Sequence, residues 1–374
     1  MKRTNVELFR PRRKLALLLP GHNEELIIST TIKSAIASGQ LKRDIYVVND
    51  ASTDNTRVIA EQMLGKANVL NVHRSGKALA VQKAIKKFKI ESQYQWLHVA
   101  DADSVFGANY FRIYRRELSS QHVVALGFVQ SLKGNWISTY RSFNYTYGQQ
   151  VYRRIQSALG MIAIFPGPVT SFRTDILRHL DLKADSLTED FDITLQVHRK
   201  NLGKILFIPG AVSYTQDPQT LADFSKQSMR WYRGIFQGVR QHNVGFRRQR
   251  IDVAIGVPLL QTFFFLFQAL VLYPLILLQT HNWLLLPAAI AIDIIVTDCL
   301  LLFSAIAIRR WNILGILPYY YFLRFFELGM YYWAFTEVIL LRRYRNSPQG
   351  WSTAGRRYRL GMGALKDARR LKTA

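Results

Sequence analysis

Several building blocks of common enzyme sites are scarce or missing in this chain of 374 residues. Its single cysteine, Cys299, lies in an apolar run, so no intrachain disulfide can form and a reducing environment fits. The eight histidines show no spacing typical of metal ligands. Neither a GxGxxG fingerprint nor a P-loop is present. These absences argue against a disulfide scaffold, a histidine-based metal centre and the usual dinucleotide and triphosphate motifs.

Acidic residues are also scarce, with 25 against 50 basic ones, which gives a net charge of +25. Such an excess indicates a polyanionic surface nearby, either nucleic acid or an anionic membrane leaflet. The cations gather in residues 226–250, where seven occur without an acid, and in 342–374, where ten occur with one aspartate. Both stretches flank an apolar block rather than line a continuous face. We therefore predict contact with membrane lipids and no nucleic acid.

The first third of the chain alternates between short apolar runs and stretches with helical spacing. The runs predicted to be buried strands are 15–19, 45–48, 69–72, 96–100 and 123–129. The first run stops at Pro20 and is too short for the apolar part of a signal peptide, so we expect none. Alternation of this kind predicts an α/β fold with a mostly parallel sheet and flanking helices.

Polar clusters follow three of these strands at the point where each strand ends. They contain Pro20, Asn23 and Glu24, then Asp50, then Asp101 and Asp103. In doubly wound sheets ligands bind beyond the carboxyl ends of the strands, so we expect the three clusters to converge on one crevice.

Asp101 and Asp103 stand two residues apart directly after a buried run. Both can direct oxygen atoms at one hard cation, and Mg²⁺ or Mn²⁺ prefers such ligands when a diphosphate supplies the rest. Two solvated turn aspartates would give the same pattern. The metal interpretation gains weight from further motifs that follow in order along the chain.

Two of those motifs lie downstream. Thr188-Glu189-Asp190 opens a predicted helix, where acids at the first turn also have a purely structural explanation. Gln227, Arg230 and Trp231 form a QxxRW motif in a basic, aromatic stretch, and their spacing puts them on one helical face. That face offers an amide, a cation for a diphosphate and a platform for a sugar ring, although membrane docking alone would explain the composition.

The ordered set of these motifs, followed by apolar segments, resembles the family 2 membrane glycosyltransferases. In chain order the motifs are Asp50, Asp101-x-Asp103, Thr188-Glu189-Asp190 and QxxRW. That family includes cellulose, chitin, hyaluronan and poly-N-acetylglucosamine synthases. The resemblance runs from about Leu15 to the C-terminus and implies a GT-A fold, a UDP-sugar donor and a divalent cation.

The resemblance also implies roles for individual residues. Asp190 would be the general base of an inverting transfer, with Glu189 beside it, and Asp101 and Asp103 would serve the metal and the nucleotide sugar. The diphosphate and the acceptor would be bound by the QxxRW side chains and by a Gly-Pro loop. These residues are Gln227, Arg230 and Trp231 of the motif, and Gly167 and Pro168 of the loop. The remaining nucleotide-sugar contacts would come from Pro20, Asn23, Glu24, Asp50 and Lys77. The family usually has Asp-Asp where this chain has Asn49-Asp50, which puts the role of the first of these positions in doubt.

The apolar block predicts a membrane region. The organisation we expect is a basic segment at 1–14, a cytosolic GT-A domain at 15–220, an interfacial amphipathic helix at 221–250, membrane segments at 254–279, 283–308 and 313–341, and a basic tail at 342–374. The third segment contains Arg324, Glu327 and Glu337, so it is either an interfacial or re-entrant element or a third span. The catalytic domain is expected at the cytoplasmic face of the cell membrane.

The sequence therefore predicts an inverting membrane glycosyltransferase that lengthens a β-linked polysaccharide from a UDP-sugar, with N-acetylglucosamine as the extrapolated sugar. A non-processive enzyme acting on a lipid or oligosaccharide acceptor is the alternative within the class. A membrane-anchored nucleotide-binding protein without catalysis is the alternative from another class. Because two or three segments make little wall for a channel, export of a polymer would need self-association or a partner protein.

Overall fold

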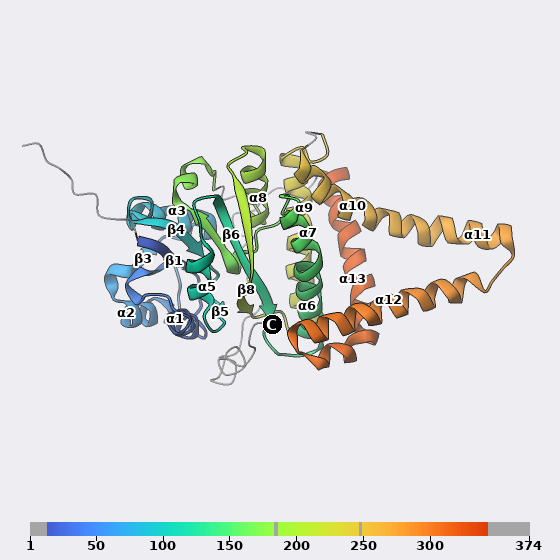
Figure 1. Cartoon of the computed structure of the whole chain (residues 1–374), viewed down its shortest axis with the longest axis horizontal. Coiled ribbons are helices and arrows are strands. Elements are labelled where there is room, and N and C mark those ends of the chain that lie inside the picture. The colour runs from blue at the N-terminus through green and yellow to red at the C-terminus, as the bar shows by residue number, and fades with distance from the viewer. Residues whose placement is uncertain (1–12, 183–185, 247–248, 343–374) are drawn as a thin grey trace, which may run out of the picture.

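The computed structural model describes residues 13–182, 186–246 and 249–342. The basic segments predicted at 1–14 and 342–374 lie almost entirely outside these residues. Within them, a sheet flanked by helices forms one end of the molecule, and a hairpin of two long helices projects from the other end (Figure 1).

One half of the sheet is the parallel arrangement that the apolar runs predict. Its strands lie in the order β3 (Val69–Val72), β2 (Ile45–Asp50), β1 (Arg13–Gly21) and β4 (Tyr94–Val99), and all three pairings are parallel. The connecting helices are α1 (Ile28–Ala37), α2 (Thr56–Leu64), α3 (Lys77–Lys87) and α4 (Ile90–Gln93). Leu15, Leu17 and Leu19 face the core under α1 and α2, whereas Ala16 and Leu18 face α3. Because β1 is covered on both faces, its sequence is continuously apolar rather than alternating.

The other half of the sheet is mixed. Beyond β4 the order continues β7 (Thr170–Arg173), β6 (His122–Ser131), β8 (Lys204–Thr215) and β5 (Val105–Phe106). Of these pairings only β6 with β8 is parallel. The α/β fold with flanking helices is confirmed, but the prediction of a mostly parallel sheet holds only for the half that contains β1. The polar run of β7 carries no apolar strand pattern, which is why the sequence did not reveal it.

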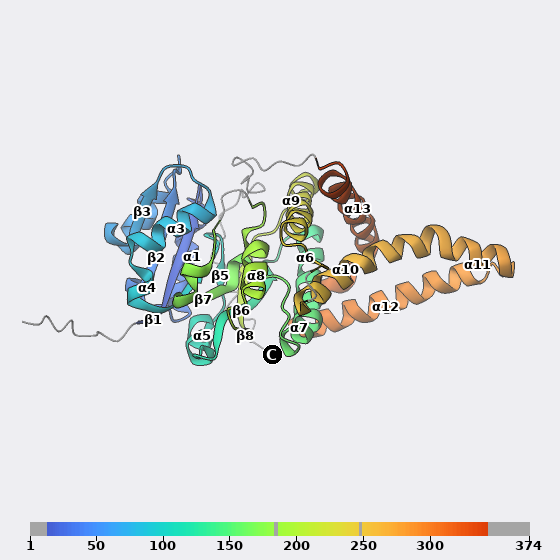
Figure 2. The same ribbon diagram turned by 90° about the horizontal axis from the view of Figure 1, so that it is seen from above.

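Three helical segments stand against this second half of the sheet and shape the site (Figure 2). They are α8 (Glu189–Arg199), α9 (Leu221–Gln241), and a long helix made of α6 (Trp136–Tyr147), a π-helical turn at Gly148–Arg153 and α7 (Arg154–Ala158). The helix predicted at 221–250 ends at Gln241, and several of its apolar positions pack inside the protein. Phe224 and Phe236 are buried, and Met229 packs with residues of α13 (Leu317–Phe335). Protein therefore covers much of the apolar face of α9, and its predicted place at the membrane surface stays a prediction.

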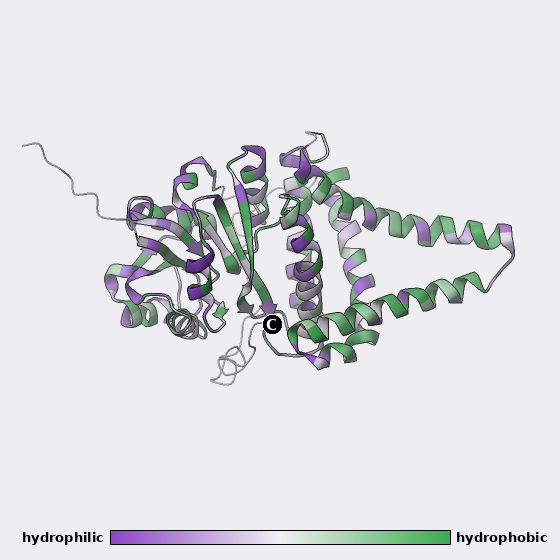
Figure 3. Ribbon diagram, viewed as in Figure 1, coloured by the Kyte–Doolittle hydropathy of each residue, from purple (hydrophilic) through white to green (hydrophobic). Residues whose placement is uncertain are grey.

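Two helices are long and apolar enough to cross a membrane. One runs from Arg250 to Thr280 and comprises α10 (Arg250–Phe267), a π-helical turn at Gln268–Leu272 and α11 (Tyr273–Thr280); the other is α12 (Leu285–Ile308). They form the projecting hairpin, whose surface is apolar on most sides (Figure 3). The third predicted segment is not among the candidate spans in the described residues. After a 3₁₀ turn at Trp311–Ile316 it forms α13, which packs against α9 and α6.

Candidate functional site

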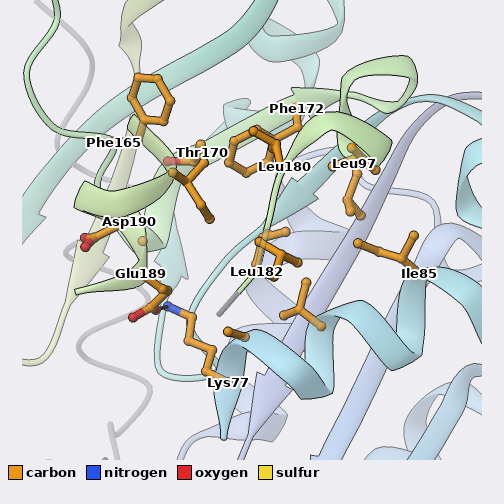
Figure 4. Close-up of a pocket in the computed structure, with 16 residues that line it drawn as sticks. Lys77, Ile85, Leu97, Phe165, Thr170, Phe172, Leu180, Leu182, Glu189 and Asp190 are labelled. Carbon is orange, nitrogen blue, oxygen red and sulfur yellow. Dashed lines mark ion pairs between the residues drawn. The ribbon is translucent and has the colours of Figure 1, made fainter. Parts of the chain in front are cut away.

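A cavity of about 410 Å³ opens between the sheet and the helices α6, α8 and α9. It collects ten of the fourteen predicted site residues, from segments far apart in the sequence. They are Lys77, Asp101, Asp103, Gly167, Pro168, Glu189, Asp190, Gln227, Arg230 and Trp231. A smaller apolar cavity of about 60 Å³ lies next to it and shares Lys77, Gly167, Glu189 and Asp190 (Figure 4).

Lys77 links two of the predicted motifs. Its Nζ lies 2.7 Å from Oδ1 of Asp101 and 2.7 Å from Oε1 of Glu189 (Figure 4 shows the latter pair). Burial alone would lower the pKa of Lys77, but the two carboxylates outweigh it and hold the pKa above its usual range. The ammonium therefore stays charged between the strand-ending aspartate and the start of α8.

Asp50 supports Lys77 from behind. Its carboxylate is 1% exposed, and it accepts hydrogen bonds from the backbone N–H groups of Ser75 at 2.7 Å and Gly76 at 2.9 Å. Gly76 has φ +79°, a conformation that L side chains rarely adopt, so the turn before α3 depends on this glycine. Asp50 thus holds the turn that presents Lys77 and does not line the cavity. Its predicted contact with a nucleotide stays a prediction.

Pro20, Asn23 and Glu24 also lie away from the cavity lining. Asn23 accepts a hydrogen bond from the backbone N–H of Thr53 at 2.9 Å, and the N–H of Glu24 donates to Oγ1 of Thr56 at 2.7 Å. These contacts tie the end of β1 to the loop that follows β2. The predicted contact of this first cluster with a nucleotide sugar stays a prediction.

Asp101 and Asp103 lie at the cavity directly after β4, as the DxD pattern predicts. Their carboxylates are the hard oxygen donors that Mg²⁺ and Mn²⁺ prefer, so the donor set fits a divalent cation. No group of three or more metal-ligating side chains occurs among residues 13–182, 186–246 and 249–342. A cation held here would therefore take further ligands from a bound diphosphate or from water.

The two carboxylates at the start of α8 differ in character. Burial alone would raise the pKa of Glu189, but Lys77 and then Arg230 hold it below its usual range. For Asp190, burial comes first and the neighbouring charge of Glu189 second, and together they raise its pKa to about 6. Adjacent acids with divergent pKa values are a common arrangement in acid-base catalysis. Asp190 is the one suited to exchange a proton near neutral pH.

The helix α9 fixes the loop in front of these acids. Arg230 donates a hydrogen bond to the carbonyl of Leu187 at 3.0 Å, and the N–H of Leu187 donates to Oε1 of Gln237 at 3.2 Å. Gly234 permits this close approach, because a Cβ atom there would lie 2.4 Å from the side chain of Thr188. Oε1 of Gln227 is buried and has no hydrogen-bond partner among the described residues, although the side chain lines the cavity.

A second wall of the cavity is formed by residues outside the predicted motifs. Tyr145 on α6 donates a hydrogen bond to Oδ1 of Asp217 at 2.8 Å, and both residues line the cavity. Burial is the main cause that raises the pKa of Asp217 to about 6, and Asp103 adds to it. Asp217 follows the strand β8, so the strand-end rule that found Asp101 would have found it as well. The π-helical turn at Gly148–Arg153 also borders the cavity, and such turns are frequent at functional sites.

Comparison with known proteins places this site in a family context. The model of the family described as Glycosyltransferase like family 2 matches residues 11–234. Poly-beta-1,6-N-acetyl-D-glucosamine synthases of Staphylococcus epidermidis and of Staphylococcus aureus (strain COL) are each 25% identical, over 229 and 231 residues respectively, which is 59% of this chain. The match covers 54% of each relative, so the chain spans about half the length of these curated relatives.

Among solved structures, a mannosyltransferase from Pyrobaculum calidifontis in complex with GDP-Man and Mn²⁺ has a TM-score of 0.52 to this chain. The identity is 15%, and the superposition covers 90% of this chain and 89% of the other. This likeness supports a shared fold across both the sheet and the helices that follow it.

Proposed function

Since the chain belongs to the glycosyltransferase-like family 2, we propose that it is an inverting, metal-dependent glycosyltransferase that uses a UDP-sugar to lengthen a polysaccharide at a membrane. The observation that carries the proposal is the meeting of Asp101 and Asp103, Asp190, and the QxxRW side chains around one cavity. The names of the two staphylococcal relatives favour N-acetylglucosamine as the sugar. The apolar hairpin supports membrane anchoring, with the catalytic domain on the cytoplasmic side.

In the proposed reaction Asp190 accepts the proton of an acceptor hydroxyl. The oxygen of that hydroxyl then bonds to the anomeric carbon, and the bond from this carbon to the diphosphate oxygen breaks, which releases UDP. One ionised carboxylate is sufficient because the leaving group is already an anion. A divalent cation held by Asp101 and Asp103 supplies positive charge for the departing diphosphate when it is bound.

Two cationic side chains have further roles in the proposed reaction. Lys77 and Arg230 place positive charge beside the donor diphosphate, and Lys77 at the same time keeps Glu189 ionised. With Glu189 charged, the second acid Asp190 has its pKa near neutrality and is ready to take the proton. Trp231 lines the cavity from α9 and offers its ring to the acceptor sugar.

The test measures UDP release by the purified full chain in detergent, with Mn²⁺ or Mg²⁺, across a panel of UDP-sugars. We expect turnover with UDP-N-acetylglucosamine that stops with a chelator and in Asp190→Asn. The matched control is Asp175→Asn, which changes an aspartate that is 48% exposed and does not line the cavity. Turnover that persists in Asp190→Asn, or is absent for every sugar, would overturn the proposal. Sizing the product then separates a polysaccharide from single addition to a lipid or oligosaccharide.

A further inference from the structure

A largely buried ion pair joins the helices α6 and α13 next to the QxxRW motif. Nη1 of Arg141 lies 3.2 Å from Oε1 of Glu327, and the two side chains are 5% and 13% exposed. The two residues are 186 positions apart in the sequence. Neither lines the 410 Å³ cavity, so the pair is not part of the binding surface itself.

The guanidinium of Arg141 touches the QxxRW motif. Its Cζ lies 4.6 Å from the ring centroid of Trp231 and 4.3 Å from that of Phe224. Its Nη2 donates a hydrogen bond of 2.6 Å to Oγ of Ser228, within the same motif. Trp231 lines the cavity and Arg141 does not, so the cation contacts the ring without forming part of the cavity wall. A cation over an indole ring is an attractive, orientation-dependent contact.

Glu327 is fully engaged at the junction of three helices. Tyr140 on α6 donates to its Oε2 at 2.6 Å, and Ser228 on α9 donates to its Oε1 at 3.4 Å. The helices α6, α9 and α13 lie side by side in both overall views (Figures 1 and 2). A largely buried carboxylate with these partners restrains the guanidinium of Arg141, because a hydrogen-bonded ion pair favours one geometry. Glu327 is the main charge that compensates Arg141, and Asp217 adds to it.

We propose that Glu327 is a positioning residue for acceptor binding, which acts through Arg141 to hold the ring of Trp231 against the cavity. The proposal rests on the proposed function for the role of Trp231, but the contacts stand independently of it. It also extends the acceptor site beyond the part of the chain that the family model matches, since α13 begins after residue 234. The third apolar segment of the sequence thereby becomes part of the enzyme's active domain.

The chain provides a matched control for this ion pair. Arg233 on α9 pairs with Glu337 at 2.8 Å, just beyond the end of α13, with side chains 28% and 23% exposed. Neither Arg233 nor Glu337 lines the 410 Å³ cavity. Glu327→Gln and Glu337→Gln are the same isosteric change in two ion pairs, one between α6 and α13 and the other between α9 and the turn after α13. Only the first should affect the acceptor platform.

The first measurement is ¹⁹F NMR of the full chain labelled with 5-fluorotryptophan. The chain has seven tryptophans, and Trp231→Phe assigns the resonance of interest. We expect Glu327→Gln to shift or broaden the Trp231 resonance, Glu327→Asp to do so less, and Glu337→Gln to leave it in place. Arg141→Lys, which keeps the charge but loses the planar guanidinium, should also move it. An unchanged Trp231 resonance in both Glu327→Gln and Arg141→Lys would overturn the proposal.

The second measurement separates acceptor binding from chemistry. With UDP-N-acetylglucosamine as donor and a β-1,6-linked N-acetylglucosamine pentamer as primer, Glu327→Gln should raise the primer KM about tenfold, equivalent to about 1.4 kcal/mol. Hydrolysis of the donor by water, without primer, should stay within about twofold because it does not use the platform. Equal loss of both activities would indicate a merely structural role and overturn the proposal. If the wild type transfers to no primer, the proposed function fails, and the NMR result still decides whether Glu327 positions Trp231.

Discussion

The close contact between α9 and the start of α8 makes Gly234→Ala an informative substitution. A Cβ atom at position 234 would lie 2.4 Å from both Cγ2 and Oγ1 of Thr188, whereas ordinary contact begins near 3.4 Å. The start of α8 must therefore move by about 1 Å to relieve the overlap, and Thr188 directly precedes the two acids of the site. A displacement of about 1 Å at a catalytic group can cost about 100-fold in rate.

The expected loss of stability is much smaller. Overpacking costs about 1–3 kcal/mol, and replacing a helical glycine by alanine regains about 1 kcal/mol of helix propensity. Gly234→Ala should therefore fold, with a modestly lower Tm, while kcat for UDP release falls about 100-fold. The assay is UDP release at saturating donor, normalised to the folded fraction measured by thermal unfolding.

Two further variants make the test specific. Gly329→Ala on α13 is the matched control, because a Cβ there meets nothing within 4 Å, and it should keep wild-type kcat. Thr188→Ala removes both atoms at 2.4 Å and leaves Cβ at 2.9 Å, so it relieves most of the overlap. The double variant should therefore be more active than the two single losses together predict. A Gly234→Ala enzyme with kcat within twofold of wild type would refute the reasoning.

Three other predictions follow from the charges of the site. Only ionised Asp190 can accept a proton, and its pKa is raised to about 6. We therefore expect kcat/KM to rise with pH through an inflection near 6 and to level off above about pH 7. An inflection near 4 in the pH-rate profile would contradict this assignment. Lys77→Gln leaves Asp101 and Glu189 without their shared cation, so we expect a lower Tm and a loss of UDP release. Lys77→Arg should partly restore UDP release. A wild-type Tm and wild-type UDP release in Lys77→Gln would count against the ion pairs. Asp103→Asn should raise the Mn²⁺ concentration needed for half-maximal activity at least about tenfold. The control Asp175→Asn should leave that concentration unchanged. Equal metal dependence in the two variants would exclude Asp103 as a ligand.

The residues whose place in the fold could be predicted are those that end a regular pattern. Asp101 and Asp103 end a buried apolar run, and the parallel half of the sheet follows from such runs, so both could be predicted. The match of the family model to residues 11–234 confirms the resemblance that the ordered motifs suggested. Local pattern is sufficient where the neighbours of a residue are set by its own strand or helix.

What could not be predicted depends on which surfaces meet. The apolar positions of α9 have the composition of a membrane-surface helix, and only the structure shows that α13 and α6 cover them. Asp50 has the expected place at the end of β2, but its carboxylate is turned to the loop before Lys77. The pairing of Arg141 with Glu327 joins positions that no local period connects. In the sequence both look like ordinary charges beside apolar segments.

Proton NMR of the sugar bond formed from UDP-N-acetylglucosamine tests the central claim most directly. The donor carries its sugar in the α configuration, and an attack assisted by Asp190 as the only base inverts the anomeric carbon in a single step. The account predicts a new β-linked N-acetylglucosamine residue in the product of the wild type and none with Asp190→Asn. An α-linked product, or the same β-linked product from Asp190→Asn, would contradict it.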